Sequence, residues 1–161
     1  MLRRIQRMLA ARPVADQNPV AHELRSLVPE NDRSLDIVAA KIGLVLLMIH
    51  SDQKVEQDER DFLVRRVQAE LRLEGPDATR LADQLLEIPE ERLELVHLGR
   101  TLAGGVSEDE RRVFLGELFG LAASDSDFHM LEERDLRVLA EALQLTRTDF
   151  VALRREIMNR E

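Results

Sequence analysis

Cysteine, tryptophan and tyrosine are absent from this sequence of 161 residues, and phenylalanine occurs only five times. Without cysteine the chain has no disulfide, no thiolate nucleophile and no thiolate-bound zinc, which is typical of a cytoplasmic protein. Aromatic residues favour strands, so their scarcity disfavours a sheet. No segment alternates apolar and polar residues with the period of two that a half-buried strand needs. The absences together point away from β-structure.

Long hydrophobic runs are missing as well. The most apolar stretch, residues 37–49, has 13 residues and includes Lys41, whereas a membrane-spanning helix needs about 20 apolar residues. Residues 1–12 place four arginines around isolated apolar positions and lack the continuous apolar centre of a secretory signal. We therefore expect a cytoplasmic protein in which residues 37–49 form a buried core helix.

The charge is unevenly distributed along the chain. The formal net charge is −8, from 23 basic and 31 acidic residues. The first twelve residues contain four arginines and no acid, so the rest of the chain has 19 basic and 31 acidic residues and a net charge of −12. A body this acidic repels the phosphate backbone of nucleic acids. We expect no nucleic-acid partner and regard cations or basic protein surfaces as better matched.

Leucine, alanine, glutamate and arginine are abundant, and these residues favour helices. From Ser34 onward apolar residues recur with the helical period. The pattern predicts an all-α single bundle of about seven helices. The first four are expected over about 34–51, over about 58–73, from Asp77 to about Glu87, and from Pro89 to near Gly104. The fifth starts at a capping box at Ser107 and continues through Leu121. The sixth follows the loop 124–129 and ends near Leu145, and the seventh follows a cap at Thr146 or Thr148.

The N-terminal third divides into two further regions. Residues 1–12 predict a short basic amphipathic helix, because apolar residues recur there at helical intervals: Leu2, Ile5, Met8 and Leu9. Such a helix either packs on its own domain or lies on an anionic membrane surface. Residues 13–33 contain three prolines and predict a linker with one helical turn around 22–28. The helical domain is then expected over residues 34–161.

Two segments of the predicted bundle resemble each other. In each, an apolar helix ends in Ser-Asp, a short polar loop follows, and the next helix starts with acidic residues. Ser51 and Ser124 occupy the same place in the two copies. A glutamate follows the aspartate by seven positions in both copies, which gives the pairs Asp52 with Glu59 and Asp125 with Glu132. The sequence therefore predicts an internally repeated helix–acidic loop–helix unit.

The four repeated carboxylates have two interpretations. As braces, Asp52, Glu59, Asp125 and Glu132 would accept hydrogen bonds from the N–H groups of the loop and of the next helix's first turn. As a metal site, the two loops would meet across a pseudo-two-fold axis and bind a divalent cation between them. The alternating oxygen ligands and central glycine of a calcium-binding loop are missing, so the pattern favours bracing. We expect no other cofactor.

The repeated segments resemble the TerB-like family, helical-bundle proteins named for tellurite resistance and related to the N-terminal region of the membrane-anchored co-chaperone DjlA. That family repeats an apolar helix, Ala-Asp-Gly, a few residues, Glu and an amphipathic helix. The corresponding residues here are Ser51, Asp52 and Gln53 with Glu59, and Ser124, Asp125 and Ser126 with Glu132.

In this chain Gln53 and Ser126 stand where the family has glycine, and residues 143–150 are similar to the family's usual ending. The resemblance covers the chain from Ser34 to its C-terminal end. It implies an all-α bundle, an association with stress response and metal binding by the acidic loops.

Residues with the spacing of a catalytic site are missing. No serine stands in a nucleophile elbow, no glycine-rich loop precedes a helix, and the histidines lack metal-ligand spacing: His22, His50, His97 and His129. We expect no enzyme, but a regulatory or scaffolding module of the TerB-like type that binds a protein partner. Two alternatives remain open: divalent-cation binding or sensing through the acidic loops, and a membrane-associated accessory protein attached through residues 1–12.

Overall fold

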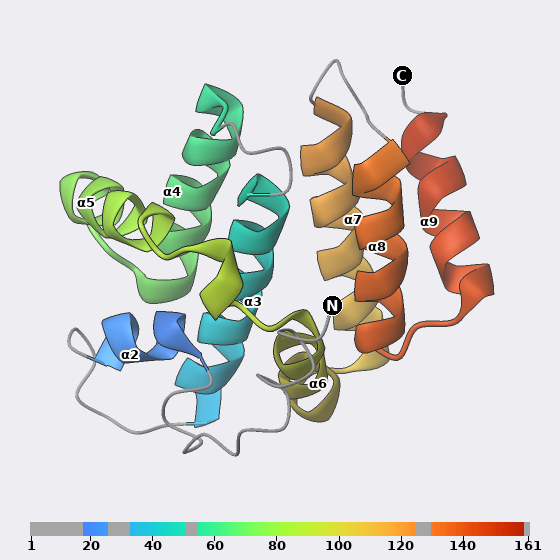
Figure 1. Cartoon of the computed structure of the whole chain (residues 1–161), viewed down its shortest axis with the longest axis horizontal. Helices are drawn as coiled ribbons and strands as arrows, with labels where there is room; N and C mark the ends of the chain where they lie inside the picture. Colours follow the sequence, from blue (N-terminus) through green and yellow to red (C-terminus); the bar gives the residue numbers. More distant parts are fainter. Residues whose placement is uncertain (1–17, 26–32, 51–54, 125–129, 160–161) are drawn as a thin grey trace.

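The computed structural model describes residues 18–25, 33–50, 55–124 and 130–159, and this part of the chain is all-α (Figure 1). It contains eight α-helices, one 3-10 turn and no strand, which confirms the predicted helical bundle. The elements are α2 (Pro19–Arg25), α3 (Arg33–His50), α4 (Gln57–Leu71), α5 (Gly75–Leu86), η2 (Glu90–Arg92), α6 (Leu95–Gly105), α7 (Glu108–Ser124), α8 (Met130–Ala142) and α9 (Arg147–Met158). None of these helices combines the length and apolar character that crossing a membrane requires.

Helix α3 is the centre of the bundle and contacts α2, α4, α6 and α7. A helix that is apolar on most faces is stable only when it is covered on most faces. Fully buried side chains accordingly point in several directions along α3: Ala39, Ala40, Ile42, Leu44, Val45, Leu46 and Ile49. The prediction that residues 37–49 form a core helix is confirmed by this burial.

Two helical hairpins, α3–α4 and α7–α8, turn at the same end of the bundle. In Figure 1 the C-terminal ends of α3 and α7 and the N-terminal ends of α4 and α8 all lie toward the top. Within each pair the helices are in contact, and α4 also contacts α7. The helices of the internal repeat therefore form two hairpins of the same orientation, in which α7 contacts both α3 and α4.

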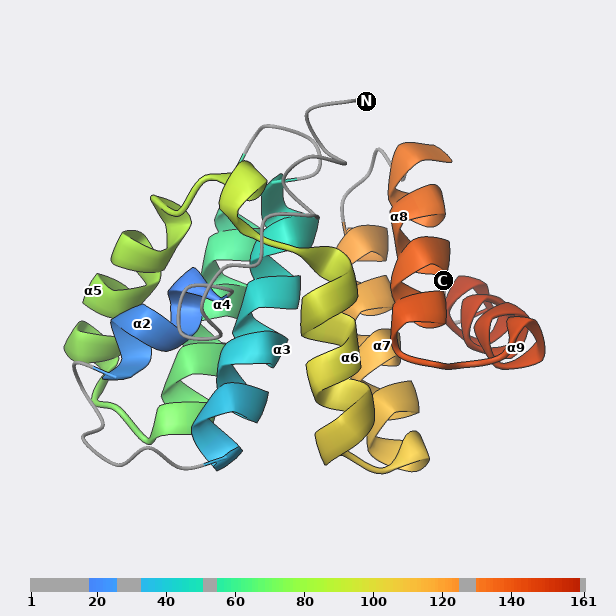
Figure 2. The same ribbon diagram turned by 60° about the horizontal axis from the view of Figure 1, so that its bottom comes forward.

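Helix α6 lies between the hairpins and contacts both α3 and α8 (Figure 2). It approaches α8 very closely at Gly99. A Cβ added to this glycine would lie 2.5 Å from the Cβ of Ala142, a distance that real side chains do not adopt. Glycine is thus required at this crossing because no other residue leaves room for the two backbones.

Helix α2 stands where the sequence predicted a linker with one helical turn around 22–28; the helix begins earlier and belongs to the core. Asn18 caps the helix, since its side-chain oxygen accepts a hydrogen bond of 3.0 Å from the N–H of Val20. Pro19 follows at the first helical position, where a missing N–H costs nothing. Val20 and Leu24 are fully buried, and α2 packs against α3. Pro19–Arg25 therefore belongs to the core, whereas the amphipathic helix predicted for residues 1–12 lies outside the described residues.

The segment after Pro89 also differs from the prediction of one helix that reaches Gly104. Pro89 precedes the 3-10 turn η2, and Leu93 and Glu94 are extended before α6 begins. This break lets both Ile88 and Leu93 reach the core, where they are 6% and 7% exposed. Residues five positions apart in a continuous helix would point in clearly different directions.

Candidate functional site

Glu59 is the one predicted metal ligand whose side chain the structure describes. Asp52, Asp125 and the side chain of Glu132 lie outside the described residues. Glu59 lies in the first turn of α4 and is only 8% exposed. Its carboxylate accepts a hydrogen bond of 3.0 Å from the backbone N–H of Glu56, the residue that precedes the helix. Glu59 therefore caps α4, as in the second half of a capping box.

The described ranges contain no group of three His, Asp or Glu side chains close enough to hold a metal ion. That finding does not include the loops that contain Asp52 and Asp125, or the side chain of Glu132 on α8. The cation site at Asp52, Glu59, Asp125 and Glu132 therefore stays a prediction.

A groove of about 700 Å³ runs between α4 and α7, near the end of the bundle where both hairpins turn. On α4 its lining follows positions 58, 61, 62 and 65, which form a single stripe along a helix. On α7 it follows positions 117, 120 and 121, which also share a face. The lining residues are Asp58, Asp61, Phe62, Val64, Arg65, Glu117, Gly120 and Leu121.

The groove combines an apolar floor with an acidic rim. Phe62 is half-buried and Leu121 is buried, so both present apolar surface at the bottom of the groove. Asp58 and Asp61 are exposed, and Asp61 accepts a hydrogen bond of 2.8 Å from the side-chain amide of Gln57. Three of the four charged lining residues are acids, and Arg65 is the fourth. The groove therefore offers burial to apolar groups and attraction to cationic ones.

Arg66 joins the two walls of the groove. Its side chain is 16% exposed and forms ion pairs with Glu117 of α7 and with Glu70 of α4. The guanidinium also lies over the rings of Phe62 and Phe114, at 5.7 Å and 5.6 Å from their centres. Such charge and cation–π contacts strengthen one another away from water. They hold α4 and α7 at a fixed spacing.

Gly120 leaves the backbone of α7 open at the groove. No atom of the described residues lies within 4 Å of the place that a Cβ would take, and the backbone does not need glycine because its φ is not positive. Glycine within a helix costs about 0.5–1 kcal/mol relative to alanine. Neither packing nor turn geometry among the described residues offsets this cost.

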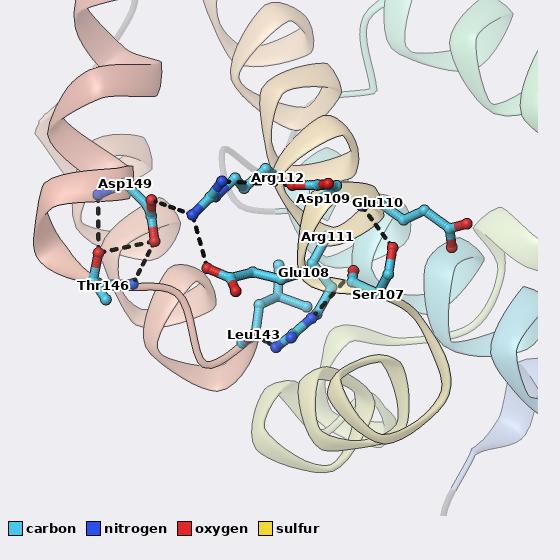
Figure 3. Close-up of polar contacts among 9 residues, drawn as sticks. All are labelled: Ser107, Glu108, Asp109, Glu110, Arg111, Arg112, Leu143, Thr146 and Asp149. Atoms are coloured by element: carbon cyan, nitrogen blue, oxygen red, sulfur yellow. Dashed lines mark hydrogen bonds and ion pairs between the residues drawn. The ribbon is translucent and has the colours of Figure 1, made fainter.

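A second polar cluster lies at the other end of α7 and joins it to α9 (Figure 3). Asp149 accepts hydrogen bonds from the hydroxyl of Thr146 at 2.8 Å and from its N–H at 3.1 Å, while the N–H of Asp149 donates to that hydroxyl oxygen. Arg112 pairs with Asp149 at 3.0 Å and with Glu108 at 2.8 Å. The hydrogen bonds from Thr146 and then the charge of Arg112 lower the pKa of Asp149.

The same cluster also closes helix α8. Arg111 donates a hydrogen bond of 2.6 Å to the carbonyl oxygen of Leu143, just beyond the last turn of α8 (Figure 3). The end of a helix leaves carbonyl groups without helical partners, and an arginine is a suitable donor for them. These contacts are those of helix caps and interhelical braces. We therefore place the candidate binding site at the α4–α7 groove.

Sequence reasoning identified Glu59 but missed the groove. Its walls come from helices more than forty positions apart in the chain, and no local pattern indicates that α4 and α7 are neighbours. One signal was available: Gly120 interrupts an apolar helix at a position where neither a turn nor a helix end was expected.

Comparison with known proteins identifies one family. A family model described as "Tellurite resistance protein TerB" matches residues 38–155, from within α3 to within α9. The matched part includes both repeated hairpins and both walls of the groove. Searches of the curated proteins and of the solved structures found no match.

Proposed function

Because the chain belongs to the TerB family of tellurite resistance proteins, we propose that it is a regulatory or scaffolding module that binds a helical segment of a protein partner in the α4–α7 groove. Proteins of this family are generally non-enzymatic. The observation that carries the proposal is the groove itself, with its apolar floor, acidic rim and open glycine. A role in stress response is the corresponding biological setting.

The dimensions of the groove suit a short helix. The α4 stripe from Asp58 to Arg65 covers eight residues, so its ends are about 10 Å apart at a rise of 1.5 Å per residue. Two turns of an amphipathic helix have the same length and present anchors at i, i+3, i+4 and i+7. The uncovered backbone at Gly120 would let such a helix approach closely.

Replacement of Gly120 tests this proposal without weakening the fold. Gly120→Gln should fill the groove, remove partner binding and stabilise the protein by up to about 1 kcal/mol, because glutamine favours helix over glycine. Gly104→Gln is a matched control, since Gly104 is also exposed in a helix with open space around it. Partners would be captured by affinity purification with chemical cross-linking, and thermal unfolding would measure the stability.

The expected result is a set of cross-links to α4 and α7 that Gly120→Gln removes and Gly104→Gln leaves. Partner capture that is equally strong in both variants would overturn the groove as the binding site. Loss of the same partners in both variants would also count against it, because the two sites lie on different helices.

A divalent-cation site is a second candidate function, favoured by the common end of the two hairpins. Loops that leave the bundle at the same end can bring their carboxylates toward one ion. A cation at 100 times its dissociation constant would raise the free energy of unfolding by about 2.7 kcal/mol. Thermal unfolding with millimolar Ca²⁺, Mg²⁺ or Zn²⁺ should then show a shift that is lost in the double variant Asp52→Asn, Asp125→Asn. An unchanged melting temperature with all three metals would overturn this candidate.

A further inference from the structure

We propose that the chain's own residues 1–12 occupy the α4–α7 groove and compete there with the protein partner. This occupancy rests on the proposed function of the groove as a helix-binding site. It adds the identity of one occupant, a basic amphipathic segment, and with it a means of regulating access.

Charge complementarity is the first reason. Residues 1–12 contain four arginines and no acid. The groove places the exposed carboxylates of Asp58 and Asp61 on its α4 wall, beside Arg65, whereas Glu117 on the α7 wall is already paired with Arg66. The segment is thus the most basic part of a chain whose remainder has a net charge of −12. Opposite charges of this kind steer a tethered segment toward the groove and fix its orientation.

The apolar pattern of the segment is the second reason. Leu2, Ile5 and Leu9 have the i, i+3, i+7 spacing that places side chains on one face of a helix. They span eight residues, as does the stripe from Asp58 to Arg65. The apolar face of the segment would therefore meet Phe62 and Leu121 along the floor, while the arginines reach the acidic rim.

The covalent connection favours this occupant over a free peptide. Residues 10–17 connect Leu9 to Asn18, the first described residue, and span up to about 30 Å when extended. Helix α3, at 18 residues, is about 27 Å long, so the segment can reach the groove from α2. A short connection raises the effective concentration of a tethered segment to the millimolar range when it can reach its site. A partner must then displace residues 1–12, so the groove would be closed until a stronger helix competes for it.

The absence of native cysteine permits a direct test in the full chain. Two cysteines, Ile5→Cys and Gly120→Cys, should form a disulfide under mild oxidation, detected by non-reducing electrophoresis and peptide mass spectrometry. The control pair is Ile5→Cys with Gly104→Cys, because Gly104 is equally open but lies on α6. Cross-linking at Gly120 should exceed the control at least tenfold. A bond within one chain places the segment in its own groove. A bond found only in disulfide-linked dimers, or a yield equal to the control, would overturn the proposal.

Charge reversal tests the contribution of the acidic rim. Asp61→Lys should lower the cross-linking yield several-fold at low salt, and Arg3→Glu in the same chain should restore part of it. Glu91→Lys is the control, since it changes the net charge equally at an exposed position on η2. Equal effects of Asp61→Lys and Glu91→Lys would overturn the charge complementarity on which the proposal depends.

The outcomes separate this occupancy from the proposed function. If Gly120→Gln removes partner binding but the Ile5–Gly120 cross-link does not form, the groove binds partners and residues 1–12 are not its occupant. If the cross-link forms but Gly120→Gln leaves partner binding unchanged, the proposed function fails instead. Attachment of the chain to anionic vesicles through residues 1–12, with Gly120 cross-linking at control level, would assign the segment to a membrane surface and overturn the occupancy.

Discussion

Arg66 connects three helices through its neighbours. It pairs with Glu117 of α7 and with Glu70 of α4, and Glu70 also pairs with Lys41 of α3 at 3.6 Å. The guanidinium contacts the faces of Phe62 and Phe114 as well. Because the side chain is mostly buried, these interactions are weakly screened by water and salt. The residue therefore contributes to the stability of the bundle and to the width of the groove.

Replacement of Arg66 should destabilise the fold. We expect Arg66→Ala to lower the free energy of unfolding by about 2 kcal/mol, because a hydrogen bond to a charged group contributes about 1.5–3 kcal/mol and a cation–π contact about 0.5–2 kcal/mol. Arg80→Ala should change it by less than about 0.5 kcal/mol, since Arg80 is 72% exposed and pairs only loosely with Asp77 at 3.8 Å. Urea unfolding of both variants would measure the difference, and similar losses would contradict it.

The start of helix α9 shows how a short element is held in place. A helix this short is marginal on its own, so its end groups and its packing decide whether it forms. Thr146 and Asp149 satisfy each other's backbone N–H groups. Phe150 is buried and packs its ring 5.2 Å from that of Phe119 on α7. The cap at Asp149 and the packing of Phe150 thus stabilise the first turn of α9 together.

The stability of this cap should depend on pH in the acidic range. Hydrogen bonds from Thr146 lower the pKa of Asp149 in the folded protein below its ordinary value of 3.8. A carboxyl group whose pKa is lowered by folding stabilises the protein above its unfolded pKa, and that stability is lost as the pH falls through the folded pKa. Asp149→Asn should therefore flatten the loss of stability below about pH 4. Urea unfolding between pH 2 and pH 7 tests this. The prediction would be refuted if the free energy of unfolding fell equally steeply at acidic pH in both proteins.

The periodicity of the apolar residues was enough to predict where helices form, whereas several helix ends could not be predicted from it. The limits of α3 differ from the predicted 34–51 by one residue because its apolar pattern is strong. Helix α5 begins at Gly75, before the predicted cap at Asp77, since Pro76 fits a first helical turn as well as a loop. Helix α8 ends early, where Gln144 adopts a positive φ of 57°. Glycine is the usual signal for that conformation, and its absence hid the turn.

The candidate site was less predictable than the fold. Glu59 was found because its capping role depends on residues nearby in the sequence. The groove depends on the packing of α4 against α7, and a single sequence does not indicate which helices pair. Only the structure shows that Phe62 is half-buried beside an opening.

At the scale of the whole molecule, the core extends further toward the N-terminus than the repeat does. Helix α2 precedes the segment matched by the TerB family and still contributes fully buried side chains to the same core. A hydrophobic core that is shared in this way unfolds cooperatively as a rule. The folding unit of this chain therefore includes residues 18–25.

Truncation of a side chain in α2 tests this extent. Leu24→Ala should lower the free energy of unfolding by about 2–4 kcal/mol, as expected for a leucine removed from a packed interior. His22→Ala, at an exposed position of the same helix, should change it by less than about 0.5 kcal/mol. Both variants should unfold in a single transition in urea. A negligible effect of Leu24→Ala, or a separate early transition, would show that α2 is a detachable appendage.

The crossing of α6 and α8 has a consequence for how this sequence can evolve. A methyl group at Gly99 would collide with Ala142, and neither backbone can retreat without disturbing the hairpin packed behind it. A Cβ at Gly99 would also lie 3.0 Å from the backbone carbonyl carbon of Ala142, and no substitution at position 142 removes that contact. We therefore expect relatives with the same crossing to keep glycine at the position of Gly99 and a small residue at the position of Ala142.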